Sequence, residues 1–355
     1  GFTGKNDIEK FGIEKFNKLC KETVWDNENA FRRLTEEMGQ FIDLDNRYIT
    51  YDNNYIETEW WILKKFFDEG LFYEGVKIMP WCPRCGTGLA SHEVAQGYKE
   101  VDANTVIVPF KLKDKDEYFL VWTTTPWTLP GNLAISVHPD FEYGVYNTSK
   151  GKFVFLKEFE NRLVEELGLE DVVLLNTIKG ETLDQVVCSH PFYERDSIIL
   201  VGDHVTNEAG TGLVHTAPGF GAEDFVVCQK YGIKPYCPVD SKGYLSEETG
   251  ERLKGLFYED ANNVVLEILK ENNALLKHTI FTHSYPHDWR TGKPLIFRAT
   301  NQWFCSIEPI RDELIQKIHE TKWYPAWGET RMVNMIKDRN DWCISRQRAW
   351  GVPIP

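Results

Sequence analysis

Hydroxyl and amide side chains are concentrated in one short stretch of the sequence that also contains two prolines. Residues 121–132 read VWTTTPWTLPGN, with Thr123, Thr124 and Thr125 in succession and Asn132 at the end. A threonine hydroxyl both donates and accepts hydrogen bonds, and an asparagine side chain does the same. Proline restricts the backbone and favours turns, so these groups are expected to gather at the end of a strand. The stretch therefore predicts a polar surface that positions a water molecule.

A second stretch adds a titratable ring and a carboxylate. Residues 210–224 read GTGLVHTAPGFGAED, so that Asp224 follows His215 by nine residues. The reference pKa of histidine, about 6.5, suits proton transfer at neutral pH, and His215 is a candidate general base. A helix predicted over residues 222–231 places Asp224 in a first helical turn, where backbone amides favour a carboxylate. A structural interpretation stays open for both residues. His215 would then be a core histidine, and Asp224 an ordinary charge at a helix terminus.

Composition restricts the class of protein. The chain has 355 residues, 42% of them hydrophobic, which suffices for one large core or for two or three smaller ones. It contains no run of about 18 apolar residues and no signal-peptide pattern. Its eight cysteines do not form a disulfide framework, so a soluble protein of the reducing cytoplasm is expected. The net charge of -14 does not by itself favour binding to a polyanion.

Hydrophobic periodicity divides the chain into a helical start and a strand-rich middle. The first 75 residues repeat apolar side chains at helical spacing, and short strands separated by turn residues follow. Strands spaced in this way favour an antiparallel sheet that closes toward a barrel. Predicted strands cover residues 105–112, 118–122, 132–137, 142–146, 152–156, 198–201 and 212–215, and later helices cover 157–167, 222–231, 259–270 and 309–318.

Both polar stretches resemble the proofreading pocket of the isoleucyl-tRNA synthetase family of class I enzymes. The related valyl and leucyl enzymes carry a Thr-Thr-Arg-Pro core, whereas this chain has Thr125 in place of the arginine. Valyl enzymes also typically place a lysine where His215 stands. Residues 12–17 and 341–351 look like the borders between the editing insertion and the two catalytic halves. The His-x-Gly-His and Lys-Met-Ser-Lys-Ser type signatures for ATP are absent, so the resemblance indicates a fragment of a larger enzyme.

The resemblance implies an editing reaction, the hydrolysis of valine from mischarged tRNA(Ile). Editing requires no cofactor, whereas the parent enzyme attaches isoleucine with ATP and Mg²⁺. The implied partners are the 3′ end of tRNA(Ile) and the rest of the synthetase chain, with no membrane and a monomeric state. The implied catalytic residues are Thr123, Thr124, His215 and Asp224, and the implied substrate-binding residues are Thr125, Trp127 and Asn132. Asp224 is expected to pair with the substrate ammonium group, and His215 is favoured as a selector of side-chain size over a general base.

The implied fold is mixed α/β, with a β-barrel-like editing domain inserted in a helical and α/β base that contains remnants of a split Rossmann catalytic domain. The expected segments are a helical connective segment at 1–78, a zinc-knuckle-like segment at 79–98, the editing domain at 99–275 and a return segment at 276–355. Five basic residues in the return segment are expected to face tRNA or ATP: Arg331, Lys337, Arg339, Arg346 and Arg348.

Cys82 and Cys85 form half of a zinc knuckle, since the intervening Pro-Arg lets both thiolates face one metal ion. In relatives that bind zinc here, a second pair of cysteines returns later, but Asp288 and Thr291 stand at those positions. His283, His287 or Asp288 could complete a mixed zinc site. Two free thiols in a tight turn are the alternative.

Two other functions fit part of the pattern. One is a free-standing deacylase that acts in trans on mischarged tRNA, and the other is a non-catalytic tRNA-binding module. Binding alone does not require the combination of Thr123, Thr124, Asn132, His215 and Asp224, so hydrolysis within a synthetase is the favoured interpretation.

Overall fold

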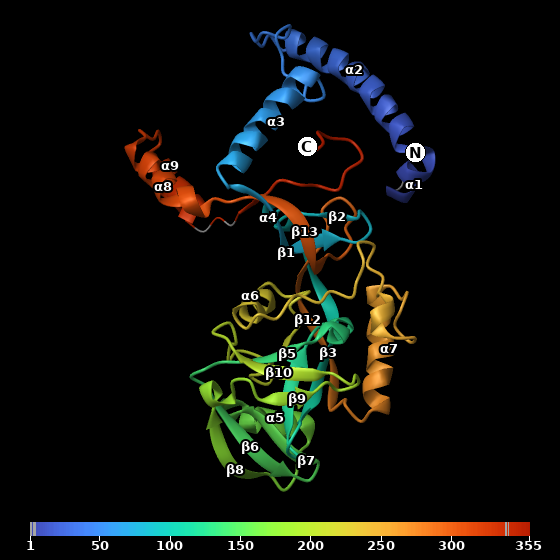
Figure 1. The fold of residues 1–355 in the computed structure, drawn as a ribbon, viewed down its shortest axis with the longest axis vertical. Helices are drawn as coiled ribbons and strands as arrows, with labels where there is room; N and C mark the ends of the chain where they lie inside the picture. Colours follow the sequence, from blue (N-terminus) through green and yellow to red (C-terminus); the bar gives the residue numbers. More distant parts are fainter. Residues whose placement is uncertain (1, 3–4, 338, 340) are drawn as a thin grey trace. The chain divides into compact units, whose positions relative to one another are not determined.

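The chain forms two compact units. The structure, a computed structural model, describes residues 2, 5–337, 339 and 341–355 (Figure 1). Unit 1 comprises residues 1–76 and 301–355, and unit 2 comprises residues 77–300. The chain passes from one unit to the other within β1 (Phe72–Cys82) and again within β13 (Ile296–Cys305). The finer division of the sequence after residues 78, 98 and 275 stays a prediction.

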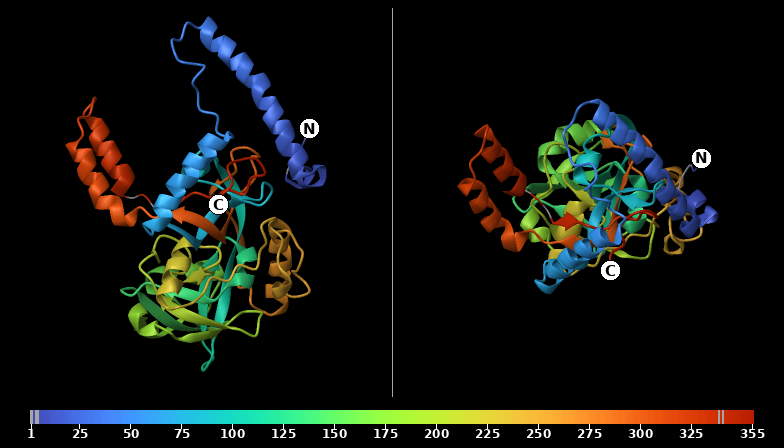
Figure 2. Two further views of the ribbon diagram at one scale, coloured as in Figure 1. Left: turned by 45° about the horizontal axis from the view of Figure 1, so that its top comes forward. Right: turned by 90° about the horizontal axis from the view of Figure 1, so that it is seen from above.

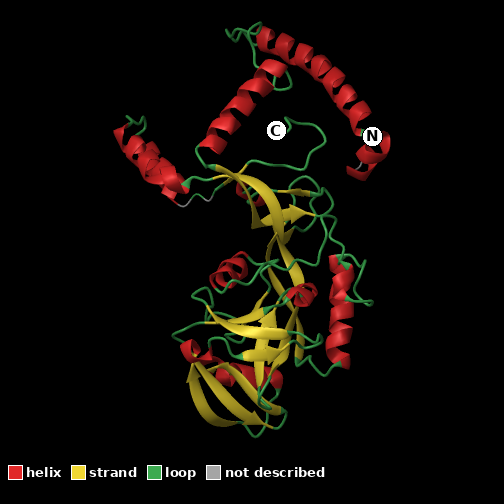
Figure 3. Cartoon of the chain, viewed as in Figure 1, coloured by secondary structure: helices red, strands yellow, loops and turns green. Residues whose placement is uncertain are grey.

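Unit 2 is built around a closed β-barrel. Six strands follow one another around it in the order β3, β9, β10, β5, β11 and β4, and the pairing of β4 with β3 closes the ring. Their bounds are β3 (Tyr98–Leu112), β4 (Tyr118–Thr123), β5 (Ala134–Val137), β9 (Val187–Ser189), β10 (Asp196–Val201) and β11 (Val214–Thr216). The predicted barrel is thus confirmed (Figure 3).

The barrel is not purely antiparallel, which corrects the prediction from strand spacing. β10 runs parallel to β5, and β11 runs parallel to β4. A parallel pair requires a long connection between its strands, and here β5 and β10 are joined through the intervening strands β6 to β9. Short strands along the sequence predict that a sheet exists, but they do not fix which strands become neighbours.

The barrel sheet continues beyond the ring at both ends. β12 (Lys277–Pro286) pairs with the first ten residues of β3, from Tyr98 to Ile107. At the other end, β4 pairs with β7 (Gly151–Leu156), which leads to β6 (Glu142–Thr148) and β8 (Val173–Lys179). Residues 105–110 of β3 are all buried, because both faces of this central strand are covered. This strand therefore links the ring to the outer strands.

Helices and turns cover the sheet of unit 2, with α6 and α7 on opposite sides of it (Figures 1 and 2). The buried residues of α7 repeat at helical spacing, from Tyr258 and Ala261 to Val265 and Leu269. The remaining bounds are α4 (Ser91–Val94), α5 (Glu160–Leu167), α6 (Ala222–Lys230), α7 (Tyr258–Glu271), β2 (Thr87–Gly88), η1 (Pro126–Gly131), η2 (Lys157–Phe159), η3 (Gly180–Leu183) and η4 (Glu247–Thr249). The turn η1 packs against α7 and carries the second half of the threonine-rich stretch.

Unit 1 is mainly helical, as the periodicity of the first 75 residues predicts. Its elements are α1 (Lys5–Phe11), α2 (Ile13–Glu37), α3 (Asn53–Asp68), η5 (Glu308–Ile310), α8 (Arg311–Glu320), α9 (Trp327–Lys337) and β14 (Trp342–Cys343), which pairs antiparallel with β13. Mixed α/β architecture is thereby confirmed for the chain. That unit 1 is a remnant of a split Rossmann domain stays a prediction.

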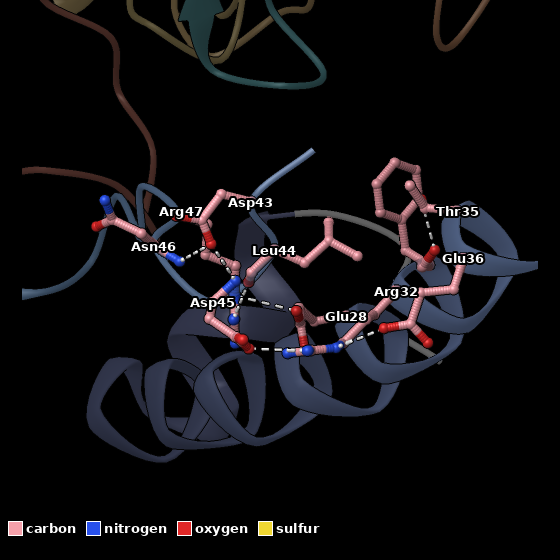
Figure 4. Close-up of polar contacts among 10 residues, drawn as sticks. Glu28, Arg32, Thr35, Glu36, Asp43, Leu44, Asp45, Asn46 and Arg47 are labelled. Atoms are coloured by element: carbon pink, nitrogen blue, oxygen red, sulfur yellow. Dashed lines mark hydrogen bonds and ion pairs between the residues drawn. The ribbon is translucent and has the colours of Figure 1, made fainter. Parts of the chain in front are cut away.

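Ion pairs hold the segment after α2 against that helix (Figure 4). Arg47 Nε lies 3.0 Å from Glu28 Oε1, and Arg32 Nη2 lies 2.8 Å from Asp45 Oδ1. The Asp43 carboxylate accepts hydrogen bonds from the backbone amides of the second and third residues after it. Ion pairs that remain in contact with solvent typically contribute at most about 1 kcal/mol each, so these pairs set the local path of the chain more than its stability.

Across the described part of the chain, every helix falls short of the combination of length and apolar character that a membrane span needs.

Candidate functional site

Three threonine hydroxyls form a hydrogen-bonded chain where β4 leads into η1. Thr123 ends the strand, and Pro126 begins the turn, a position where the missing amide proton costs nothing. Thr125 Oγ1 lies 3.3 Å from Thr123 Oγ1 and 3.1 Å from Thr128 Oγ1. The predicted cluster of hydroxyls therefore exists, and it includes Thr128, which the sequence did not single out.

The chain of hydroxyls ends on His215. This residue lies in β11, next to β4 in the barrel, and its side chain is only 7% exposed. Its Nε2 lies 3.0 Å from Thr128 Oγ1, and its Nδ1 lies 2.9 Å from Asn132 Nδ2. Both ring nitrogens of His215 are therefore engaged by residues of the first stretch.

The surroundings of Asn132 determine which nitrogen of His215 carries the proton. Asn132 Nδ2 also lies 2.8 Å from the carbonyl oxygen of Ala134, which can only accept a hydrogen bond. The amide nitrogen must therefore face both Ala134 and His215, while Ser197 Oγ donates to Asn132 Oδ1 at 2.8 Å. It follows that Nδ1 of His215 accepts and that Nε2 carries the proton.

Thr128 gives the same tautomer independently. Its hydroxyl donates to the carbonyl oxygen of Thr125 at 2.8 Å, so it has no second proton to give to the ring. Nε2 of His215 must then donate to Thr128 Oγ1, and Thr125 must donate its hydroxyl proton to the same oxygen. All the hydrogen-bonding groups from Asn132 to Thr125 are thereby assigned.

His215 is neutral near pH 7. Burial lowers its pKa to about 3, and the positive charge of Arg195 acts in the same direction. The ring therefore has no charge, and its one lone pair is occupied by Asn132. A general base needs an available lone pair and a pKa near the working pH, so this arrangement is unsuited to that role.

Thr124 is the member of the threonine run whose hydroxyl is not used. Its side chain is half-buried, and among the described residues it has no hydrogen-bond partner. The hydroxyls on either side, those of Thr123 and Thr125, are bonded to each other. Thr124 therefore offers the donor and acceptor that remain for a water or a substrate.

Asp224 lies in the first turn of α6, as predicted. Its Oδ2 accepts a hydrogen bond of 2.8 Å from the backbone amide of Ala217, two residues after His215. Any side chain at position 221 would displace the carboxylate, because a Cβ on Gly221 would lie 2.5 Å from this oxygen. Burial raises the pKa of Asp224 to about 6, and the hydrogen bond from Ala217 opposes that shift. No hydrogen bond of the described residues joins the Asp224 carboxylate to His215 or to the threonines.

Trp127 lies in the core, although the sequence predicts that it binds substrate. Its side chain is 6% exposed, and its ring centroid lies 5.0 Å from that of Phe220 and 5.1 Å from that of Tyr258. Its backbone amide donates to Asn262 Oδ1 of α7 at 3.1 Å. These two ring contacts and the hydrogen bond to α7 suit anchoring of η1 better than contact with a substrate.

The predicted metal ligands Cys82 and Cys85 lie next to Asp288, one of the three residues proposed to complete their site. Cys82 Sγ lies 3.6 Å and Cys85 Sγ 3.4 Å from Asp288 Oδ2, and all three ligand atoms lie within 4.8 Å of one another. Thr291 does not reach the cysteines but donates its hydroxyl to the same carboxylate oxygen at 2.7 Å. Nδ1 of His287 instead faces the backbone oxygen of Tyr285.

The sequence did not single out the residues that hold η1 and Asn132 from β10 and the turn before it. Ser197 bonds the side chain of Asn132, and His190 Nε2 donates to the carbonyl oxygen of Leu129 at 3.0 Å. These contacts join residues that are 61 to 65 positions apart, through a parallel pairing of β5 with β10. No local pattern in the sequence reports such a pairing.

Comparison of the sequence with known proteins identifies a family. Over residues 1–355, the chain matches the model of class I tRNA synthetases (I, L, M and V), and it belongs to that family. Isoleucine–tRNA ligases of Bacillus cytotoxicus and Bacillus cereus are each 48% identical to it over 349 residues, which confirms the predicted resemblance. That match covers 97% of this chain and 38% of each relative, so the chain spans well under half of their length.

Among solved structures, the editing domain of the P. knowlesi cytosolic leucyl-tRNA synthetase is similar, with 14% sequence identity and a TM-score of 0.41. The match covers 53% of this chain and 99% of that chain. The barrel described above rests on the strand pairings of this chain alone.

Proposed function

We propose that unit 2 is an editing site that hydrolyses valine from mischarged tRNA(Ile), within an enzyme that attaches isoleucine to this tRNA. One observation carries the proposal: among the described residues, the Thr124 hydroxyl has no partner, next to a hydrogen-bond chain formed by its neighbours and His215. Sequence kinship with isoleucine–tRNA ligases supports the choice of tRNA and of amino acid.

Hydrolysis of an aminoacyl ester makes modest chemical demands, and the site meets them without an activated nucleophile. Among the described residues, no serine or cysteine side chain is bonded to His215, so the attacking group is water. Water adds to the ester carbonyl, the bond to the ribose oxygen breaks, and a water proton ends on that oxygen. Thr124 orients the water or the carbonyl, which places the reactants in a productive geometry.

Asp224 recognises the amino acid end of the substrate. Both valine and isoleucine carry an ammonium group, and a charge-assisted hydrogen bond to a half-buried carboxylate is stronger than a neutral one. The carboxylate is fixed by the backbone amide of Ala217. It therefore holds the amino acid without distinguishing the two side chains.

Selection between the two amino acids falls to the wall of the pocket. One methylene group in an apolar pocket provides only about 1–3 kcal/mol of discrimination, and the choice between isoleucine and valine by isoleucyl-tRNA synthetases is the standard example of that limit. A second site that admits only the smaller side chain supplies the missing fidelity. His215, held rigidly through both ring nitrogens, is suited to form that wall together with Thr125.

Deacylation assays test this proposal. The chain should hydrolyse valyl-tRNA(Ile) about 10- to 100-fold faster than isoleucyl-tRNA(Ile), as expected for one methylene. Thr124→Val, which replaces the free hydroxyl with a methyl group of similar size, should slow hydrolysis about tenfold, the usual effect of one lost hydrogen bond. Binding of tRNA without hydrolysis of either ester would instead favour a non-catalytic binding module, and this proposal would be abandoned.

We also propose that Cys82, Cys85 and Asp288 hold one Zn²⁺. A tetrahedral zinc ion with bonds of about 2.3 Å to sulfur and about 2.0 Å to oxygen separates those ligand atoms by about 3.5 Å. The observed distances from Asp288 Oδ2 to the two sulfur atoms are 3.6 and 3.4 Å. Asp288 Oδ1 is also buried without a hydrogen-bond partner. Thr291 orients the carboxylate, as outer partners of metal ligands commonly do.

Titration with Co²⁺ checks the metal proposal, because thiolate ligands give this ion intense absorption in the near ultraviolet. One equivalent should saturate the band, and Thr291→Val should weaken metal affinity about 10- to 100-fold. Cys188→Ser, which changes a buried thiol away from the cluster, is the matched control and should have no effect. Saturation that survives Cys82→Ser would rule out this set of ligands.

A further inference from the structure

Arg195 lies beside the candidate site with an incomplete set of partners. Its Nη2 donates to the carbonyl oxygen of Pro130 at 2.7 Å, and its guanidinium carbon lies 5.2 Å from the ring centroid of Tyr193 and 5.4 Å from that of Tyr236. Its Nε is buried and has no hydrogen-bond partner. Within the described ranges it makes no ion pair with a carboxylate.

A half-buried guanidinium without a counter-charge is unfavourable, because its charged form has lost water and gained no anion. Burial accordingly lowers the pKa of Arg195, and the two tyrosines only partly oppose this shift. The Tyr236 hydroxyl is hydrogen-bonded to both Arg195 and Glu248, so this carboxylate reaches the guanidinium only through the tyrosine. Among the described residues, no carboxylate therefore pairs directly with Arg195, and an anionic ligand would supply the missing counter-charge.

The turn that carries Arg195 is rigidly connected to the candidate site. His190 and Arg195 bond the carbonyl oxygens of Leu129 and Pro130 in η1, and Ser197 at the start of β10 bonds the side chain of Asn132 just after η1. The positive charge of Arg195 also acts on His215. An anion held by Arg195 would therefore be fixed relative to Thr124 and the hydrogen-bond chain.

We propose that Arg195, flanked by Tyr193 and Tyr236, binds a backbone phosphate of the single-stranded RNA end that carries the ester. The inference rests on the proposed function and names the part of its substrate that this arginine takes. Arginine presents parallel N–H donors that match two phosphate oxygens, and the guanidinium of Arg195 is only half-buried. Single-stranded RNA is commonly bound by a cation together with aromatic rings on which bases stack.

The net charge of the chain gives weight to an unneutralised cation. At -14, these 355 residues together repel a polyanion, so their affinity for RNA depends on local cations that are not already neutralised. Several arginines of unit 2 are paired with acidic residues, as Arg252 is with Glu267 and Glu271. Arg195 combines an unpaired charge with a position next to the predicted catalytic groups.

Salt dependence of RNA binding tests the proposal. The probe is an RNA minihelix that carries no amino acid and has the single-stranded 3′ end of tRNA(Ile). It is titrated into the full chain at several salt concentrations. Arg195→Met should weaken binding about 10- to 100-fold. It should also reduce the slope of log K against log salt by about 0.7, the value for one phosphate contact to a single strand. Arg195→Lys keeps the charge and should keep the slope while losing part of the affinity.

Arg162→Met is the matched control. Arg162 also donates to a backbone carbonyl, that of Gly210, and lies 4.0 Å from the ring centroid of Phe159, but it is more exposed. Its loss should leave affinity and slope unchanged.

A purely structural role for Arg195 predicts a different pattern, with lower kcat, an unchanged salt slope and rescue by lysine; that pattern overturns the proposal. Equal effects of Arg162→Met and Arg195→Met overturn it as well. Failure of the wild-type chain to hydrolyse valyl-tRNA(Ile) would count against the proposed function, whereas normal hydrolysis with an unchanged slope in Arg195→Met counts against this inference alone.

Discussion

Replacing His215 with alanine should reduce the preference of the chain for valyl-tRNA(Ile) over isoleucyl-tRNA(Ile) by as much as one methylene commands, about 1–3 kcal/mol. The reason is geometric. His215 is held through both ring nitrogens, so its ring is a fixed wall and not a mobile group. Removing the ring admits the larger side chain, and isoleucyl-tRNA(Ile) should then be hydrolysed.

The rate for valyl-tRNA(Ile), which already fits the pocket, should also fall in this variant. Asn132 Nδ2 and Thr128 Oγ1 each lose a buried partner, and an unsatisfied buried polar group costs about 1–3 kcal/mol. His138→Ala, which removes a histidine that stacks on Phe141 away from η1, is the control for general effects of histidine loss. It should leave the ratio of the two rates unchanged.

A general base predicts a different result for His215→Ala, namely equal losses for both esters with an unchanged ratio. Steady-state deacylation of the two substrates by wild type and variant separates the cases. A ratio that stays constant while both rates collapse would assign His215 the role of base.

Stability against pH gives an independent measurement of the buried, neutral ring. The pKa of His215 is about 3 in the folded chain, and that of an unfolded histidine is about 6.5. The unfolded chain therefore binds more protons between these values. The contribution of neutral His215 to the free energy of unfolding is fully present above about pH 6.5. It is lost as the pH falls below that value, by about 1.4 kcal/mol per pH unit. The variant His215→Ala should lose stability less steeply over this range.

Regular, amphipathic elements were predictable from the sequence because their own side chains report which face is buried. The helix predicted over residues 259–270 is α7 (Tyr258–Glu271), whose apolar residues recur at helical spacing. β8 (Val173–Lys179) was missed because it lies outside the barrel ring and most of its residues are exposed, so no alternation marks it. The parallel pairings were missed because they join strands that are far apart in sequence.

The residues of the candidate site were likewise only partly predictable from the sequence. Thr123, Thr125, His215 and Asn132 lie in contiguous stretches whose composition is unusual, and the structure brings them into contact. Arg195 and Ser197 reach the same turn from β10 and its preceding loop, and nothing in their local sequence indicates it. The tautomer of His215 was also beyond sequence, because it depends on the carbonyl group that Asn132 faces.

Asp224→Asn should reduce kcat/KM for valyl-tRNA(Ile) by about 10- to 100-fold, the effect of losing a charge-assisted hydrogen bond to the substrate ammonium group. Asparagine retains an oxygen that can accept from the amide of Ala217, so the local fold should persist. Glu223→Gln is the matched control, because Glu223 is the exposed neighbour in the same first turn of α6. It should have little effect on the rate.

The pH dependence of the wild-type rate should follow the same carboxylate. Its pKa in the folded chain is about 6, so Asp224 is ionised at pH 7 and becomes neutral as the pH falls through about 6. Hydrolysis of valyl-tRNA(Ile) should decline over that interval in the wild type and not in Asp224→Asn. A substrate that carries a hydroxyl in place of the ammonium group should be equally slow with both proteins.

Stability completes the test of Asp224. Burial raises its pKa above the unfolded value, so the folded chain binds the proton more tightly, and stability from this group is lost as the pH rises through about 6. At pH 7 the ionised carboxylate therefore opposes folding, and Asp224→Asn should melt at the same temperature as the wild type or higher. A carboxylate that lowers stability but is needed for hydrolysis is typical of a functional site. A lower melting temperature together with unchanged deacylation would show instead that Asp224 is a structural cap of the Ala217 amide.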